Sequence, residues 1–176
     1  RGLENYKWMS AEKAGIIENK YRNDVIAKLC GQLKGQILIL IKKLDQGKVL
    51  IDNISAAHFL YGEIDQKERT EITKRFDSGE EFVLVASTIF DEGIDIRNVN
   101  HVIIAGGGSS FIKALQRVGR GTRVTATKKQ VDIYDFWDDI NPILLKHSRE
   151  RVKIYRKYGF EDVIFHEDSE VKKLLL

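Results

Sequence analysis

The feature that most constrains the fold is a series of five short apolar runs separated by polar, helix-like segments. Most of these runs are almost continuously apolar, which is typical of strands buried on both faces, whereas a half-exposed strand alternates. Strands that alternate with helices predict a parallel sheet with helices on both sides. The predicted strands are residues 36–41, 58–61, 82–87, 101–105 and 131–137.

The clearest helix between these runs covers residues 65–79. Asp65 can cap its first turn, and Ser78–Gly79 can end it. Ile72 and Phe76 lie four residues apart and so share one face of the helix. Further helices are predicted at residues 21–33, 44–54, 109–120 and 141–160, the last starting at Pro142.

The composition suits one folded domain of ordinary size, since 43% of the 176 residues are hydrophobic and 31% are charged. A net charge of +3 is too small to indicate nucleic-acid binding by itself. The single cysteine, Cys30, excludes an intrachain disulfide, and no apolar run approaches the roughly 20 residues that span a bilayer. We therefore expect an intracellular protein, in cytoplasm, nucleoid or nucleus, that does not bind membranes.

One window of the chain is strongly one-sided in charge. Between Ile96 and Val131 there is no Asp or Glu, and a stretch so basic after strand ends should attract phosphate. On a helix, arginines three residues apart would share a face of about 120°. The planar, permanently charged guanidinium suits a phosphoryl group, so phosphate binding is the favoured interpretation. The alternative interpretation is that these arginines pair with acids distant in the sequence. The cations are Arg97, Lys113, Arg117, Arg120, Arg123, Lys128 and Lys129.

The segment A-S-T-I-F-D-E-G-I-D-I (residues 86–96) is a second candidate site, because it follows a predicted strand directly. The hydroxyl of Ser87 lies at the carboxyl end of a strand, where open parallel sheets bind ligands. Gly93 permits a sharp turn or a close approach to a ligand, and Asp95 adds a carboxylate. A plain turn is the alternative interpretation.

Two familiar kinds of site are missing from the sequence. The G-G-G-S-S segment (residues 106–110) lacks the G-x-x-x-x-G-K-[ST] pattern of a phosphate-binding loop, so a tight strand-to-helix turn is the favoured interpretation. The four histidines are scattered without ligand spacing, so no metal site is predicted.

Together these motifs resemble those of superfamily 2 helicases. Residues 116–123, Q-R-V-G-R-G-T-R, resemble motif VI, Q-x-x-G-R-x-x-R, and residues 86–96 resemble motif V at a fitting distance. Residues 36–47 resemble motif IV. The wording of these segments is most similar to DNA helicases of the XPB and phage UvsW type, and the resemblance covers roughly residues 36–137.

The resemblance implies the second, C-terminal RecA-like domain of such a helicase, an open and mostly parallel α/β sheet with helices on both faces. In the family, ATP and Mg²⁺ lie between two such domains and are held mainly by the first, whose phosphate-binding loop is missing here. Residues 1–35 would be a helical lead-in from that N-terminal domain, residues 36–140 the RecA-like domain, and residues 141–176 a basic helix and tail packed on it. The fragment alone would then be inactive as an ATPase.

The resemblance also assigns roles to individual residues. Arg120 and Arg123 would be arginine fingers for the γ-phosphate. Gln116 and Arg117 would lie at the interface between the two domains. Gly93 and Asp95 would lie near the ribose and that interface, and nucleic-acid phosphates would be contacted by Ser87, where the family usually has Thr, and by Lys42 and Lys43.

Three functions remain open from the sequence. The favoured one is half of an ATP-dependent DNA helicase or translocase. The alternatives are a nucleic-acid-binding module without catalysis, and a motor that acts on RNA or on a polypeptide. The basic helix at residues 141–160 has two interpretations as well, a solvated face or a surface that faces nucleic acid.

Overall fold

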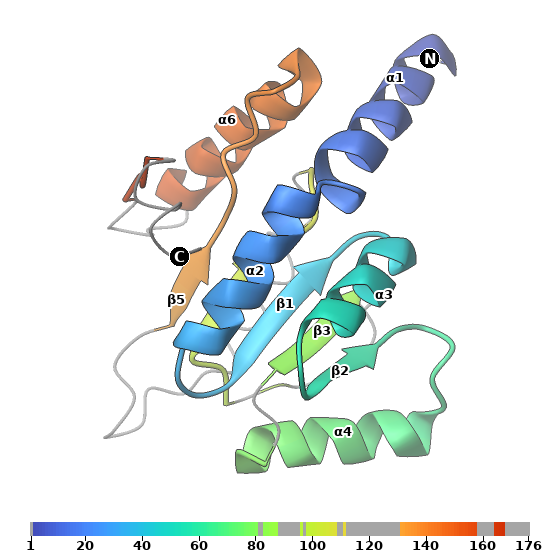
Figure 1. Cartoon of the computed structure of the whole chain (residues 1–176), viewed down its shortest axis with the longest axis vertical. Coiled ribbons are helices and arrows are strands. Elements are labelled where there is room, and N and C mark those ends of the chain that lie inside the picture. Colours follow the sequence, from blue (N-terminus) through green and yellow to red (C-terminus); the bar gives the residue numbers. More distant parts are fainter. Residues whose placement is uncertain are drawn as a thin grey trace.

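A computed structural model describes residues 2–80, 83–87, 96, 98–108, 111, 131–157 and 164–167. Its strands form one sheet in the order β2-β3-β1-β4-β5, and every neighbouring pair is parallel (Figure 1). The predicted parallel α/β sheet is therefore confirmed. The strands are β1 (Ile37–Ile41), β2 (Ala57–Leu60), β3 (Val83–Ser87), β4 (His101–Ile104) and β5 (Asp132–Tyr134).

Helices connect and cover these strands. Most of the predicted helices are found within two or three residues of their expected ends, and the prediction at residues 109–120 lies outside the described residues except for Phe111. No helix among the described residues combines the length and apolarity needed to cross a membrane. The helices are α1 (Gly2–Glu12), the π-helical turn η1 (Lys13–Ile17), α2 (Lys20–Gln32), α3 (Leu44–Asn53), α4 (Gln66–Ser78) and α6 (Pro142–Lys157).

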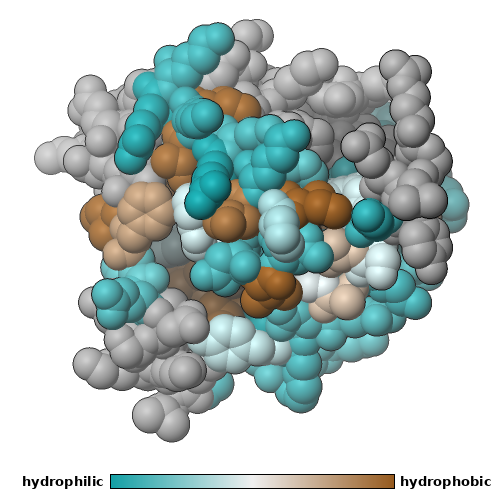
Figure 2. Space-filling view, turned by 90° about the horizontal axis from the view of Figure 1, so that it is seen from above, coloured by the Kyte–Doolittle hydropathy of each residue, from teal (hydrophilic) through white to brown (hydrophobic). Residues whose placement is uncertain are grey.

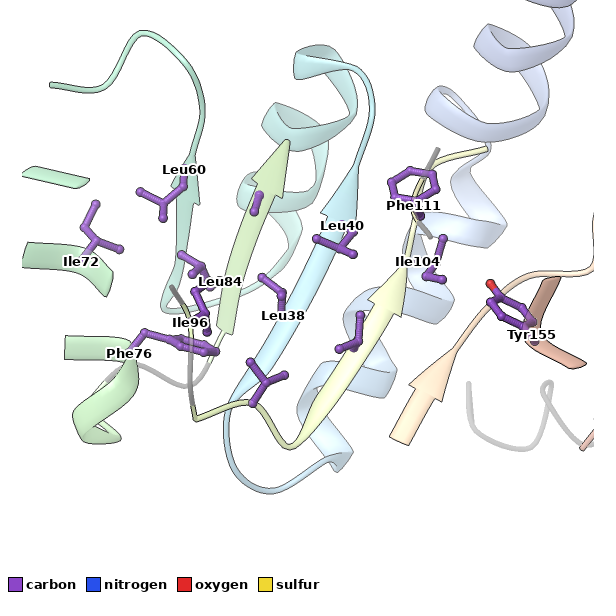
Figure 3. Packing of buried hydrophobic residues seen from close by; sticks show 13 residues of the cluster. Leu38, Leu40, Leu60, Ile72, Phe76, Leu84, Ile96, Ile104, Phe111 and Tyr155 are labelled. Carbon is purple, nitrogen blue, oxygen red and sulfur yellow. The ribbon is translucent and has the colours of Figure 1, made fainter. Parts of the chain in front are cut away.

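Both faces of the sheet are buried, which explains why its central strands are continuously apolar. Leu38 and Leu40 of β1 point to one face, where they join a cluster with Ile72 and Phe76 of α4 and with Tyr155 of α6 (Figure 3). The alternate residues of β1 point to the other face and pack with α2 and α3. The two helical layers on opposite sides of β1 thus follow from one uninterrupted run of aliphatic residues.

Helix α4 shows how local sequence sets an element's ends. The carboxylate of Asp65 accepts hydrogen bonds from the backbone N–H groups of Lys67 (2.8 Å) and Glu68 (3.0 Å), as its capping position predicts. Gly79 closes the helix with a left-handed backbone, φ 88°, a conformation that glycine adopts without steric cost. The cap, the buried face and the stop were all predictable from neighbouring residues.

Helix α2 is packed into the core. Ile26 has no exposed surface, and it clusters with Cys30 and with the strand residues Ile37 and Ile39. Burial raises the pKa of the Cys30 thiol to about 12, so this cysteine is an inert packing residue. The boundary placed after residue 35 remains a proposal about domain division, but α2 contributes to the same core as the sheet.

We predict that Ile26→Ala lowers the free energy of unfolding by about 2–5 kcal/mol, because it leaves a cavity under the sheet. Tyr21→Ala, on the exposed side of the same helix, should change stability far less. Urea denaturation of both variants measures the difference. An effect of Ile26→Ala as small as that of Tyr21→Ala would show that α2 is not part of the cooperative core.

Candidate nucleotide and nucleic-acid interface

The candidate site lies at the edge of the sheet where the strands end. Ile41 of β1 is in register with Ser87 of β3, so Ser87 and the lysines that follow Ile41 lie at the same edge. The strands point upward in Figure 1, and Figure 2 views the molecule from that side, where hydrophilic side chains cover much of the surface. The carboxyl ends of parallel strands are the usual place for ligands in such sheets.

Ser87 is central to this edge and is only 1% exposed. Its Oγ atom is buried, with no hydrogen-bond partner in the part of the chain that the structure describes. A buried hydroxyl without a partner is unfavourable by about 1–3 kcal/mol, so a hydrogen-bond acceptor that reached this atom would stabilise it. The predicted contact between Ser87 and a nucleic-acid phosphate therefore requires that the phosphate reach the buried Oγ atom.

Lys42 and Lys43 behave differently, although both follow β1. The Lys42 ammonium lies 3.6 Å from a carboxylate oxygen of Glu12 and 5.1 Å from the ring centroid of Trp8. Glu12 is 2% exposed, so the positive charge of Lys42 offsets a buried negative one. Lys43 is exposed, and its carbonyl accepts the first hydrogen bonds of α3 from the N–H groups of Gln46 and Gly47.

Trp8 and Glu12 are residues of this edge that the sequence did not indicate. Both lie on α1 or at its end, about thirty residues before Lys42, and no spacing pattern links them to it. The Trp8 ring also contacts His147 of α6 edge-on, with centroids 4.5 Å apart. Burial lowers the pKa of His147; the charge of Glu150 opposes this shift, and the charges of Arg151 and Lys42 add to it.

The glycines that follow β4 are closely packed. The tight strand-to-helix turn favoured above stays a prediction, because most of the helix expected at residues 109–120 lies outside the described residues. A Cβ atom on Gly106 would lie 2.5 Å from Phe111 Cζ and 3.0 Å from the backbone nitrogen of Lys42, and one on Gly107 would clash with Ile16. Gly108 has φ +93°. Close packing and backbone conformation thus explain these glycines without a bound phosphate.

The carbonyl of Ala105, just before this turn, receives three side-chain hydrogen bonds. Arg22 of α2 donates two, from Nε (3.1 Å) and Nη2 (2.9 Å), and Gln46 of α3 donates one (2.9 Å). Arg22 also forms a buried ion pair with Asp138, which follows β5. The end of β4 is thereby joined to two helices and to the last strand.

A second buried arginine extends this network. Arg151 of α6 is 1% exposed and donates to Asp135 from Nε at 2.7 Å, while its Nη2 lies 3.5 Å from Asp138. Burial alone would lower the pKa of Arg151, but Asp135 and Asp138 raise it, so it stays charged. The hydroxyl of Tyr155 donates to Asp135 at 2.7 Å, and burial together with the Asp135 charge raises the pKa of this tyrosine.

The remaining predicted site residues lie outside the described residues. These include both proposed arginine fingers and the residues assigned to the ribose and the domain interface. Their assignments stay predictions. They are Gly93, Asp95, Gln116, Arg117, Arg120 and Arg123.

The strand order and two helical layers define a RecA-like helicase domain. The profile described as "Helicase conserved C-terminal domain" matches residues 21–125, and the chain belongs to this family. The resemblance inferred from the motifs is confirmed.

Individual relatives support the same family. The chain is similar to the ATP-dependent DNA helicase uvsW of enterobacteria phage T4, with 28% identity over 166 residues, covering 81% of this chain and 33% of uvsW. The crystal structure of T4 UvsW superimposes with a TM-score of 0.62, covering 78% of this chain and 32% of that one.

Two further relatives differ in the nucleic acid that their names specify. A DNA 3'-5' translocase XPB2 of Sulfurisphaera tokodaii is 46% identical over 56 residues, which is 32% of this chain and 13% of the translocase. An ATP-dependent RNA helicase SUB2 of Eremothecium gossypii is 27% identical over 143 residues, 78% of this chain and 33% of the helicase. The chain thus spans a third or less of the length of these relatives.

We predict that Asp138→Ala lowers the free energy of unfolding by about 3–5 kcal/mol, because it leaves the buried charge of Arg22 without its carboxylate. The exposed neighbour Asp139 provides the control, and Asp139→Ala should change stability little. Chemical denaturation measures both. A stable Asp138→Ala variant would mean that the network does not hold the edge together.

Proposed function

We propose that this chain is the C-terminal motor domain of an ATP-dependent DNA helicase or translocase of superfamily 2. The observation that carries the proposal is the family match over residues 21–125, which includes all three arginines of the Q-R-V-G-R-G-T-R segment. The sequence has no phosphate-binding loop of its own, so ATP and Mg²⁺ would be held mainly by an N-terminal RecA-like domain. That domain would be the chain's first partner.

In this proposal the domain supplies part of an ATP site that lies mainly on the N-terminal RecA-like domain. Arg120 and Arg123 would place positive charge at the γ-phosphate, where negative charge develops during hydrolysis. Gln116 and Arg117 would lie at the domain interface, and Gly93 and Asp95 near the ribose. The arginines gain a phosphate partner only in the closed form, so bound ATP favours closure and hydrolysis favours opening.

The nucleic-acid path would follow the carboxyl edge. A backbone phosphate near Ser87 would give its hydroxyl an acceptor, and exposed Lys43 would add charge. Lys42 is paired with Glu12, so it would reach a phosphate only by leaving that carboxylate. Contacts of this kind bind the backbone and not the bases, so we expect weak sequence preference and strong salt dependence.

DNA is favoured because uvsW and XPB2 are named as acting on DNA. RNA is the second candidate substrate, since SUB2 is named as an RNA helicase and matches a similar share of this chain. The two are separated by measuring which nucleic acid stimulates ATP hydrolysis of the full-length protein. Stimulation by RNA alone would replace DNA in this proposal.

We predict that Arg120→Ala in the full-length protein lowers the rate of ATP hydrolysis by about 10³-fold or more, as expected for an arginine finger. The isolated 176-residue chain should show negligible hydrolysis. Arg75→Ala, an exposed arginine on α4, serves as the matched control and should retain the rate. Normal ATP hydrolysis by the Arg120→Ala variant would refute the finger assignment. If nucleic-acid binding by the full-length protein were the same with and without ATP, a non-catalytic binding module would be favoured.

A further inference from the structure

Helix α6 presents two chemically different faces. Its inward face carries Leu144, Ser148, Arg151 and Tyr155, which recur every three or four residues and are all buried. Five of the helix's six cations point the other way. We call these five the basic stripe: Lys146, Arg149, Lys153, Arg156 and Lys157.

The basic stripe is compact, and no acid of the described residues pairs with it. At 100° per residue its five cations fall within an arc of about 100° on the helix. All five are exposed, and none forms an ion pair with an acid among the described residues. The helix has one acid, the half-buried Glu150.

Helix stability explains only part of this arrangement. Arg156 and Lys157 lie in the last turn, where positive charge favours the carboxyl end of the helix dipole. Lys146, Arg149 and Lys153 lie earlier, away from that end of the helix. Glu150 has the helical spacing to attract Lys146 and Lys153, but no ion pair to it is found among the described residues, and five like charges on one face still repel each other.

The stripe begins at the candidate site. Lys146 is next to His147, whose ring contacts Trp8, and Trp8 in turn lies over Lys42. Figure 1 shows that α6 starts beyond the strand ends, on the same side of the sheet as α1, and descends toward the end of β5. The basic stripe therefore lies beside the proposed nucleic-acid path, at the side of the molecule where the strands end.

We propose that the basic stripe binds the phosphate backbone of a nucleic-acid duplex. From Lys146 to Lys157 it extends about 16 Å. A length of B-DNA axis of about 16 Å carries about five phosphates on each strand, so a duplex beside α6 offers enough phosphates within reach for the five cations. The inference rests on the proposed function for its ligand, but it concerns a surface outside the helicase motifs.

This binding is independent of nucleotide. Arg151 and Tyr155 fix the inward face of α6 through Asp135, so the stripe keeps its geometry whatever happens at the γ-phosphate. The stripe would hold the duplex beside the motor while the edge of the sheet binds and releases a strand.

The test is a titration of fluorescently labelled duplex DNA with the 176-residue chain, without ATP, over a range of salt concentrations. Lys146→Gln/Lys153→Gln removes two stripe charges. We expect it to weaken binding roughly tenfold at about 50 mM salt and to make the slope of log K against log salt shallower by about 2. Both lysines are exposed, so the melting temperature should be unchanged.

The matched control is Lys67→Gln/Lys74→Gln on α4. It removes the same charge, from the same residue type, at the same seven-residue spacing on an exposed helix face, but beside acids. This control should bind like the parent chain. Equal affinities of the two double variants would overturn the inference.

Two further outcomes separate this inference from the proposed function. If the stripe variant loses binding to phosphatidylserine vesicles but binds duplex DNA normally, the stripe is a membrane contact and the inference is wrong. If duplex binding is unaffected while Arg120→Ala abolishes ATP hydrolysis of the full-length protein, the inference fails and the motor assignment stands. Loss of duplex binding in the stripe variant alone supports the inference whatever the hydrolysis rate.

Discussion

The structure depends on one buried cation, the guanidinium of Arg22. It joins the carbonyl of Ala105 at the end of β4 to the carboxylate of Asp138, and it stacks on the Phe136 ring with its central carbon 4.0 Å from the centroid. A buried charge is tolerated only where such partners are in place, because desolvation is otherwise too unfavourable. Through Asp138 the network reaches Arg151, so α2, β4 and α6 cannot move independently at the edge of the sheet.

The network also explains why α6 has one buried, paired arginine and several exposed cations. Arg151 points inward and is neutralised by Asp135 and Asp138, which fixes the rotation of α6 about its axis. Once that rotation is set, Lys146 and Lys153 have to face solvent, because they lie on the opposite side of the helix. An inward ion pair thus determines where the outward positive charge is displayed.

The sequence predicted what local patterns determine, and missed what distant partners determine. The strands and α4 were predictable because apolar runs, the Asp65 cap and Gly79 act within a few residues. The pairing of Arg22 with Asp138 spans 116 residues and leaves no periodic signal. Composition alone makes Arg151 one more cation of the basic helix predicted at residues 141–160, although its spacing from apolar Leu144 and Tyr155 marks the buried face. At the candidate site, the strand ends placed Ser87 and Lys42 together, but nothing indicated that Glu12 would neutralise Lys42.

The proposed division of the site between two domains has a physical reason. If Arg120 and Arg123 are arginine fingers, they gain most from a phosphate supplied by another domain, and nucleotide state would then be converted directly into closure. Net movement along a duplex further requires one contact that changes with nucleotide and one that persists, since simultaneous release would let the motor dissociate. In the proposed function the edge near Ser87 would make the first contact. The outward face of α6, whose orientation Arg151 fixes, would make the second.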